Sequence, residues 1–332
     1  MKNFIFICLC FLLAIFALPI AFTKSFKIAN GEIPQEKDES AQNNYDYQKY
    51  KTIKLLHSKT GEVEELLLDT YIKGVVAAEM PASYNEEALK AQAVVARTYT
   101  IYTIIHNNNK HENADLCDNS SCCQAWISKE DRLAKWEESK RDEYLKKIEN
   151  AVDSTNGKII TYNGEVIDAF FHSNSGGITE TPVNVWGGTN YPYLQSVQTA
   201  GEDAYNQYSS EVTLSKEEFV NKIKEKHPDL TINFDDEHCI EIKEFTESNR
   251  VKTIKVGNIN MSGVEMRTLL SLKSTKFEVK IDKDNINFKV TGYGHGVGMS
   301  QTGADSMAKQ GSNYEDIIHH FYTNVEIVDY HD

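Results

Sequence analysis

Apolar residues recur at helical spacing in the segment that follows Asp69. The stripe runs from Ile72 to Val76, and three or four positions further along it stands Glu79, where another apolar residue would be expected. Pro81 ends this helix, because proline has no backbone N–H and disfavours helical geometry at the residue before it. The pattern therefore predicts a helix that is capped by Asp69 and points a carboxyl group inward or into a cleft from its last turn.

The remaining periodic and alternating runs predict a mixture of short helices and strands. A second helix is expected after Pro81, opened by a capping box of Ser83 and Glu86 and continuing to about His106. A largely charged helix is expected within 126–154. Further helices are expected at 214–227, 300–309 and 314–321, strands at 51–56, 62–67, 159–162, 165–172, 239–245, 251–256 and 325–328, and tight turns at Thr60-Gly61 and Asn163-Gly164.

Together these elements predict an α+β fold, arranged as a mixed two-lobed domain with a central cleft. The chain has 332 residues, which is long for a single hydrophobic core. We expect a core domain at 51–195 that carries Glu79, an inserted α+β subdomain at 196–290, and a return to the core at 291–332.

The N-terminal segment predicts attachment to a membrane. An uninterrupted apolar run from Phe4 to Phe22 approaches the ~20 residues that cross a bilayer, and Lys2 precedes it as a positive-inside signal. The interpretation favoured is a single transmembrane helix at 1–23, with a cleaved signal peptide as the alternative. The polar stretch at 24–50 is expected to be a flexible tether. The N-terminus would then be cytoplasmic and the rest of the chain outside the cell membrane.

The charge balance excludes one class of partner. The formal net charge is −14, and no basic patch stands out along the chain. A polyanionic backbone would be repelled, so nucleic acid is not an expected ligand.

One imidazole and three thiols cluster in an otherwise polar loop. They belong to His111, Cys117, Cys122 and Cys123. Four nitrogen or sulfur ligands suit a closed tetrahedral zinc site, which would be structural rather than catalytic. A disulfide between Cys117 and Cys122 or Cys123 is the alternative for an exported protein.

Glu79 is the candidate catalytic acid. Its position on an apolar stripe and at the negative end of a helix dipole favours the protonated carboxyl group. Such a group suits a general acid that works near neutral pH. The alternative is a glutamate whose stem packs on the core while its carboxylate is solvated or paired with Arg97.

Two further motifs resemble catalytic or phosphate-binding loops only superficially. His172 and Ser173 open a polar run after a strand, but the nucleophile elbow G-x-S-x-G is absent, so a loop that contacts sugar hydroxyls is favoured over a serine nucleophile. Glycines alternate around His295 without matching a phosphate-loop pattern, and they predict a close approach of the backbone at a turn. The role of His295 stays open at this point.

Five ordered motifs resemble those of the SpoIID family, the stage II sporulation protein D and LytB-type amidase-enhancer group of cell-wall proteins. The similarity covers roughly residues 50–330. The motifs are EMPASYNEEALKAQAVVARTYT from Glu79, FFHSNSGGITE from Phe170, WGGTNYPYL from Trp186, MSGVEMRTLLSLKSTKF from Met261, and GYGHGVGMSQTGA from Gly292.

The resemblance implies a membrane-anchored peptidoglycan lytic transglycosylase that acts during engulfment, on glycan strands freed of stem peptides and alongside other sporulation cell-wall hydrolases. Glu79 would be catalytic. Similarity to clostridial members also implies a structural zinc, although these often have His-Cys where this chain has Cys122-Cys123. Residues expected to orient the glycan are Gln92, Arg97, Gln124, His172, Ser173 and Thr179.

Two other functions remain open from the sequence. The domain could be a non-catalytic, peptidoglycan-binding activator of a cell-wall amidase, in which case Glu79 would belong to a binding groove. It could also be a zinc amidase itself, but the sequence lacks HExxH, and four protein ligands would leave no open position for a water molecule.

Overall fold

The computed structural model describes residues 50–106 and 110–330. The predicted membrane anchor at 1–23 and the tether at 24–50 lie outside the described residues, apart from Tyr50. Within the described ranges, no helix combines the length and the apolar character that a bilayer span requires.

The chain enters its fold through a hairpin that leads directly into a helix. β1 (Thr52–Leu56) pairs antiparallel with β2 (Val63–Leu67), as predicted, and α2 (Leu68–Glu79) follows without a linker. The predicted cap at Asp69 is wrong, because the helix begins at Leu68, its cap position is Leu67, and no side chain caps it. Glu79 is the last residue of α2, since the backbone turns to extended geometry at the next residue, before proline.

The long helix α3 (Glu86–His106) begins later than predicted. The predicted capping box of Ser83 and Glu86 is wrong, because Glu86 is the first helical residue and Ser83 therefore does not occupy the cap position. Asn85 lies before the helix instead, and its side-chain oxygen accepts the backbone N–H of Glu87 at 3.0 Å. This bond satisfies one of the free amide groups that every helix start leaves.

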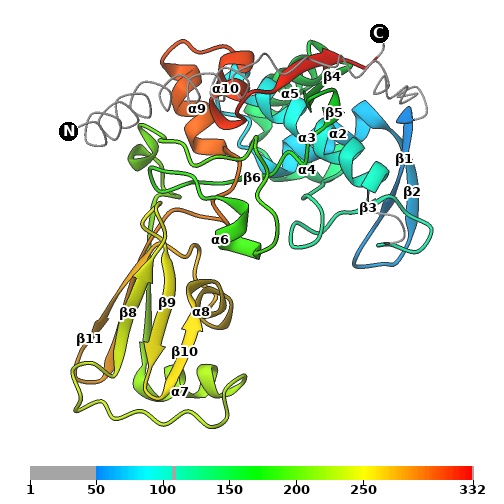
Figure 1. Ribbon diagram of the computed structural model, residues 1–332. Helices are drawn as coiled ribbons and strands as arrows, with labels where there is room; N and C mark the ends of the chain where they lie inside the picture. The colour runs from blue at the N-terminus through cyan, green and yellow to red at the C-terminus, as the bar shows by residue number, and fades with distance from the viewer. Residues whose placement is uncertain (1–49, 107–109, 331–332) are drawn as a thin grey trace, which may run out of the picture. The chain divides into compact units, whose positions relative to one another are not determined.

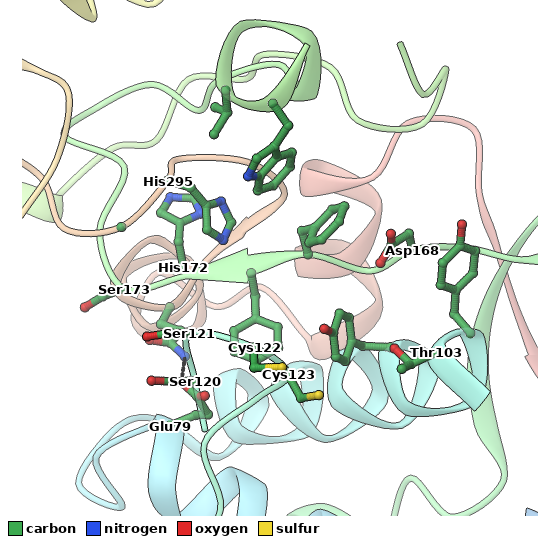
Figure 2. Close-up of a pocket in the computed structure, with 18 of the residues that line it drawn as sticks. Glu79, Thr103, Ser120, Ser121, Cys122, Cys123, Asp168, His172, Ser173 and His295 are labelled. Carbon is green, nitrogen blue, oxygen red and sulfur yellow. Dashed lines mark hydrogen bonds between the residues drawn. The ribbon is translucent and has the colours of Figure 1, made fainter. Parts of the chain in front are cut away.

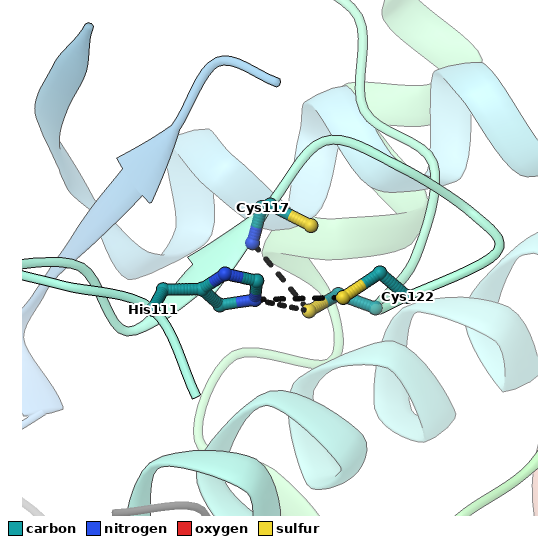
Figure 3. Close-up of side chains that lie close together, drawn as sticks. His111, Cys117 and Cys122 are labelled. Atoms are coloured by element: carbon teal, nitrogen blue, oxygen red, sulfur yellow. Dashed lines mark hydrogen bonds between the residues drawn. The ribbon is translucent and has the colours of Figure 1, made fainter. Parts of the chain in front are cut away.

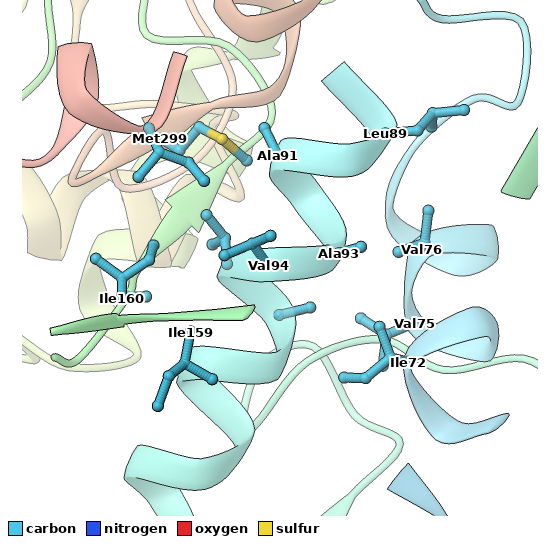
Figure 4. Close-up of a cluster of buried hydrophobic side chains, with 14 of the residues drawn as sticks. Ile72, Val75, Val76, Leu89, Ala91, Ala93, Val94, Ile159, Ile160 and Met299 are labelled. Atoms are coloured by element: carbon cyan, nitrogen blue, oxygen red, sulfur yellow. The ribbon is translucent and has the colours of Figure 1, made fainter. Parts of the chain in front are cut away.

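Helix α3 is the centre of the main hydrophobic core. It packs against other elements on almost every side, which explains its alanine-rich, nearly continuous apolar sequence. Figure 4 shows Ala93 facing Val76 of α2, and Val94 facing Ile160 on the other side. Its other neighbours are α5 (Arg141–Asp153), β4 (Lys158–Tyr162), α9 (Gln301–Lys309) and α10 (Tyr314–Phe321).

Two segments predicted as single elements are divided. The helix predicted within 126–154 breaks at Trp136, whose backbone is extended and whose ring packs on Tyr144 with centroids 5.5 Å apart. The strand predicted at 165–172 is interrupted where the N–H of Phe170 bonds to the carbonyl of Asp168 at 3.0 Å, a tight turn. The resulting elements are α4 (Lys129–Lys135), η2 (Glu138–Lys140), α5, β5 (Glu165–Val166) and β6 (Phe171–His172).

The middle of the chain builds a second hydrophobic cluster from residues between Val212 and Val290. Two three-stranded antiparallel sheets, ordered β10-β9-β8 and β11-β12-β7, supply most of it (Figure 1). The helix predicted at 214–227 is present as the first helix of this cluster, and Ser215 and Glu218 form a capping box at its start. The elements are β7 (Ser209–Ser215), α7 (Lys216–Lys224), β8 (Ile240–Phe245), β9 (Val251–Val256), β10 (Ile259–Ser262), α8 (Gly263–Leu270), β11 (Phe277–Ile281) and β12 (Asn285–Thr291).

The last part of the chain rejoins the first core. β13 (Met299–Ser300) pairs parallel with β6, and β14 (Glu326–Asp329) pairs antiparallel with β4. Gly298 makes the first pairing possible: its φ is +69°, and a Cβ there would lie 2.0 Å from the carbonyl oxygen of Phe170. The predicted close backbone approach in the glycine-rich turn is thus confirmed. The remaining elements are β3 (Leu116–Cys117), α6 (Pro182–Trp186) and η3 (Glu202–Ala204).

Candidate active site and metal cluster

Glu79 opens onto a cavity of about 1110 Å³. This volume slightly exceeds the 300–1,000 Å³ typical of small-ligand pockets, so the cavity has room for a segment of a larger molecule. Its walls come from widely separated parts of the chain, including α8 of the second cluster. The lining residues include Glu79, Lys110, Cys122, Cys123, Asp168, Phe170, His172, Ser173, Trp186, Arg267, Tyr293, His295 and Gln301.

The carboxyl group of Glu79 is held by one donor on each oxygen. The backbone N–H of Ala125 donates to Oε1 at 2.7 Å, and the amide of Gln301 donates to Oε2 at 3.4 Å. Gln301 is oriented in turn by a 3.4 Å contact with the side-chain oxygen of Gln92. Arg97 does not contact Glu79, so the alternative of an ion pair between the two is excluded.

The surroundings of Glu79 set its acidity in two opposing ways. Burial raises the pKa of Glu79 above the ordinary glutamate value, while the hydrogen bonds from Ala125 and Gln301 limit the rise because they favour the carboxylate. A carboxyl group of this kind keeps its proton up to a higher pH than an exposed glutamate does, and can then donate it. The hydrogen bonds still stabilise the carboxylate once the proton has left. Both properties are needed in a group that acts first as an acid and then as a base.

His172 presents an unused acceptor beside the cavity. Its Nδ1 lies 3.0 Å from the carbonyl oxygen of Val297 and must therefore carry the proton, since a carbonyl only accepts. Nε2 is buried and has no hydrogen-bond partner among the described residues. Burial, with the nearby Arg250 guanidinium, lowers the pKa of His172 to about 4, so the ring is neutral. A hydroxyl or amide N–H of a ligand would satisfy the bare nitrogen.

Aromatic rings form one wall of the cavity. The ring of Trp186 is 4.6 Å from that of Phe170 and 5.1 Å from that of His295, measured between centroids. Trp186 is 50% exposed although it is the largest of the three. An exposed, supported aromatic face in the cavity that Glu79 also lines is a surface on which a sugar ring can lie.

The buried carboxylate of Glu202 anchors the polar loop that carries Ser173. Glu202 accepts hydrogen bonds from the backbone N–H groups of Ser175 and Gly177 at 3.0 and 2.8 Å, and from the hydroxyl of Thr302 at 3.0 Å. These bonds hold the pKa of Glu202 below its ordinary value against the opposing effect of burial. The loop is therefore fixed in place before any ligand arrives.

Four residues expected to orient a ligand do not line the cavity. Arg97 is fully buried and bonds to Asp69 at 3.0 Å and to the carbonyl of Thr155 at 2.8 Å, so its position is structural. Gln124 donates to the hydroxyl of Tyr71 inside the core. The other two are Gln92, which reaches Glu79 only through Gln301, and Thr179, which bonds to backbone groups of a neighbouring loop.

The predicted metal ligands come together. His111, Cys117, Cys122 and Cys123 offer donor atoms that all lie within 4.8 Å of one another. Figure 3 shows the imidazole of His111 directed at the thiol of Cys122. β3 pairs parallel with β1 and so fixes Cys117 at the edge of the first sheet.

The donor set fits a tetrahedral ion such as zinc. Zinc bonds of 2.0–2.3 Å place ligand atoms about 3.3–3.8 Å apart, and Nε2 of His111 lies 3.3 Å from the sulfur of Cys123 and 3.7 Å from that of Cys122. Burial and the neighbouring thiols raise the pKa of Cys123 to about 12. Thiolate groups this close together would repel one another, and a cation bound between them would remove that repulsion. None of the four cysteines in the described part of the chain forms a disulfide, although a thiol pair would be free to oxidise.

Several cavity residues could not have been singled out by type or spacing. Gln301, Trp186, Arg267 and Asp168 lie far apart in sequence and meet only in the fold (Figure 2 shows Asp168 on the other side of Cys122 and Cys123 from Glu79). All but Asp168 lie in the five sequence motifs quoted above. Their place in these motifs was the only feature of the sequence that could have pointed to them.

Comparisons with known proteins agree with this architecture. Residues 56–162 match the family described as SpoIID, Stage II sporulation protein. The chain is 36% identical over 278 residues to Stage II sporulation protein D of Bacillus subtilis (strain 168), and 35% identical over 278 residues to that of Bacillus amyloliquefaciens, in each case covering 83% of this chain and 78% of the relative. It is also 28% identical over 313 residues to the amidase enhancer of B. subtilis, covering 78% of this chain and 40% of the enhancer. The chain belongs to the SpoIID family of stage II sporulation proteins.

Proposed function

We propose that this protein is a peptidoglycan lytic transglycosylase that cleaves the bond between MurNAc and GlcNAc during sporulation engulfment. The observation that carries the proposal is the partly buried carboxyl group of Glu79, with its raised pKa, beside a cavity large enough for a stretch of glycan. The family membership supports a role in sporulation and at the cell wall.

In this mechanism one carboxyl group performs both proton transfers. Glu79 protonates the glycosidic oxygen as the bond breaks, and its carboxylate then takes the proton of the MurNAc C6 hydroxyl, which closes a 1,6-anhydro ring. The donors from Ala125 and Gln301 stabilise the carboxylate between the two steps. No water is consumed, so the paired carboxyl groups of ordinary glycoside hydrolysis are not required.

Other residues of the cavity would hold the glycan against Glu79. The bare Nε2 of His172 would accept a hydrogen bond from a sugar hydroxyl or acetamido N–H. Ser173 lies beside it in the anchored loop, and the exposed face of Trp186 would support a sugar ring. These contacts would bring the C6 hydroxyl towards the carboxylate instead of towards solvent.

Mass analysis of the products tests the proposed function. Purified glycan strands incubated with the full chain should yield fragments that end in 1,6-anhydro-MurNAc, each lighter by one water than a reducing end. Products with reducing ends alone would make the protein a hydrolase. An absence of cleavage would rule out both enzymatic mechanisms.

A second function is favoured by one specific finding, the similarity to a protein named amidase enhancer. In this case the same cavity would bind glycan without cleaving it, and the chain would stimulate a separate cell-wall amidase. Addition of the purified chain to such an amidase would raise the release of stem peptides while no anhydro ends form.

We further propose that the chain acts outside the cell membrane, held there by a single transmembrane helix at 1–23, and works with other sporulation cell-wall hydrolases. The apolar run from Phe4 to Phe22 supports the anchor. The metal cluster would hold one structural zinc ion, bound by His111 and the three thiols. Its contribution would be to fix the polar loop whose continuation supplies the N–H of Ala125 to Glu79.

Removal of zinc is expected to lower the melting temperature by roughly 5–10 °C, because the ion binds the folded chain far better than the unfolded chain. Metal analysis of the parent should give about one zinc per chain. The Cys123→Ser variant should lose the metal and the stability together.

The chelated protein, kept below its new melting temperature, should retain measurable glycan cleavage. Complete loss of cleavage with an intact fold would move the catalytic centre to the metal. Mass spectrometry that finds a Cys117–Cys123 disulfide in place of zinc would remove the site.

A further inference from the structure

The cavity contains an arginine with no acidic partner. Arg267, on α8 of the second hydrophobic cluster, lines the same cavity as Glu79. Its Nε donates to the carbonyl of Leu272 at 3.3 Å, and this is its one hydrogen bond among the described residues. Neither terminal nitrogen of the guanidinium group has a hydrogen-bond partner within residues 50–106 and 110–330.

A second basic side chain, that of Lys110, also lines the cavity but is differently placed. The ammonium group of Lys110 donates to the carbonyl of Cys122 at 2.6 Å. Burial raises the pKa of the nearby Asp168 to about 7, and the charge of Lys110 opposes this rise. Arg267 has no such neighbour, and no ion pair involving it is found in the described parts of the chain. Partly burying a charge without a counter-ion is costly, so proteins rarely do it without a ligand to bind.

The surroundings of Arg267 strengthen the local positive potential. Arg250 lies close enough for the charge of Arg267 to lower its pKa, and His172 and His295 are held neutral by burial beside them. The two buried carboxylates whose charges act on Arg250, those of Glu180 and Glu202, are already occupied by hydroxyl and N–H donors. In a chain of net charge −14, this end of the cavity is therefore suited to an anion.

We propose that Arg267 binds a carboxylate of the glycan, the lactyl carboxylate of a MurNAc residue, and thereby selects strands that carry it in free form. The inference rests on the proposed function of the cavity. A guanidinium group with two free terminal nitrogens can hold a carboxylate through paired hydrogen bonds. A stem peptide converts that carboxylate into a neutral amide, and GlcNAc has no carboxyl group at all. The lactyl group is thus the one acid in an unmodified wall glycan.

Two chemically matched substrates test this assignment. One is a peptide-free glycan strand, and the other is the same strand after its lactyl carboxylates have been coupled to methylamine, which removes the charge with little change in size. For the full chain, we expect the carboxylate strand to have a kcat/KM about 10- to 100-fold higher, the range of a charge-assisted hydrogen-bond pair. In Arg267→Gln the ratio should fall close to one, and in Arg267→Lys it should be intermediate.

A ratio between substrates separates recognition from folding, because a damaged fold lowers both rates alike. Lys289→Gln is the charge-matched control: Lys289 is an exposed cation on β12 outside the cavity, and its variant should keep the parent ratio. An unchanged ratio in Arg267→Gln would overturn the proposal.

If the parent does not cleave glycan, binding measurements can still test whether Arg267 binds the lactyl carboxylate. Calorimetry of the parent with the two strands should then show tighter binding of the carboxylate form, and Arg267→Gln should lose that preference. Equal affinity of the parent for both strands would overturn the assignment, whether or not the protein is an enzyme.

Discussion

The Glu79→Gln variant is expected to cleave glycan about 10²- to 10⁴-fold more slowly than the parent, which is the usual contribution of a general acid or base. Glutamine keeps an oxygen for the N–H of Ala125 and nearly the same shape, but it can neither deliver nor take a proton. The release of muropeptides by purified protein measures the rate, and a melting curve reports the fold.

The fold of Glu79→Gln should be at least as stable as the parent at neutral pH. Burial raises the pKa of Glu79 above its value in the unfolded chain. Its stabilising contribution is therefore complete below the unfolded pKa and is lost as the pH rises through the folded pKa. Parent cleavage should decline over that same rise, since the acid must start protonated.

The control for this pair of measurements is Glu65→Gln on the exposed face of β2, which should change neither rate nor melting temperature. Glu79→Gln with a native melting curve and the parent rate of cleavage would show that Glu79 is not the acid.

The Arg97→Met variant is expected to lose about 3–5 kcal/mol of stability, the cost of breaking a buried charge network by removing one partner. Arg97 is fully buried, and its guanidinium group bonds to Asp69 and to the carbonyls of Val152, Thr155 and Lys158. Without it, Asp69 and these carbonyls would lose the buried cationic donor that links them across the core. Denaturant unfolding followed by circular dichroism measures the loss.

The matched control is Lys90→Met on the same helix. Lys90 is only partly buried and pairs with Glu87 at 2.7 Å near the surface, where such pairs contribute at most about 1 kcal/mol. If Arg97→Met keeps its stability but loses affinity for glycan, Arg97 belongs to the binding site after all. The structure leads us to expect the opposite.

The position of Glu79 could be predicted because it depends on local rules. The apolar stripe from Ile72 to Val76 and the stop at Pro81 determine which way the end of α2 faces, and both are readable within a dozen residues. The clustering of Cys117, Cys122 and Cys123 was equally local.

Arg97 is one of the four residues expected to orient the glycan that do not line the cavity, and its partners are non-local. Arginine on a helix next to a motif with a catalytic candidate suggests a ligand, but Asp69 and the carbonyls of Val152, Thr155 and Lys158 surround it only once the core has formed. Trp186, Arg267 and Gln301 were missed as individual site residues for the same reason. Their roles follow from tertiary contacts that periodicity does not encode.

The hydrogen bond between Glu79 and Gln301 joins residues that are 222 positions apart. A nascent chain on the ribosome therefore contains the acid long before it contains the group that completes its setting. Until α9 has been synthesised and packed against α3, the carboxyl group of Glu79 lacks the donor to its Oε2 atom. The complete setting of the acid, and with it the proposed cleavage of glycan, therefore requires the C-terminal part of the chain to be translated and folded.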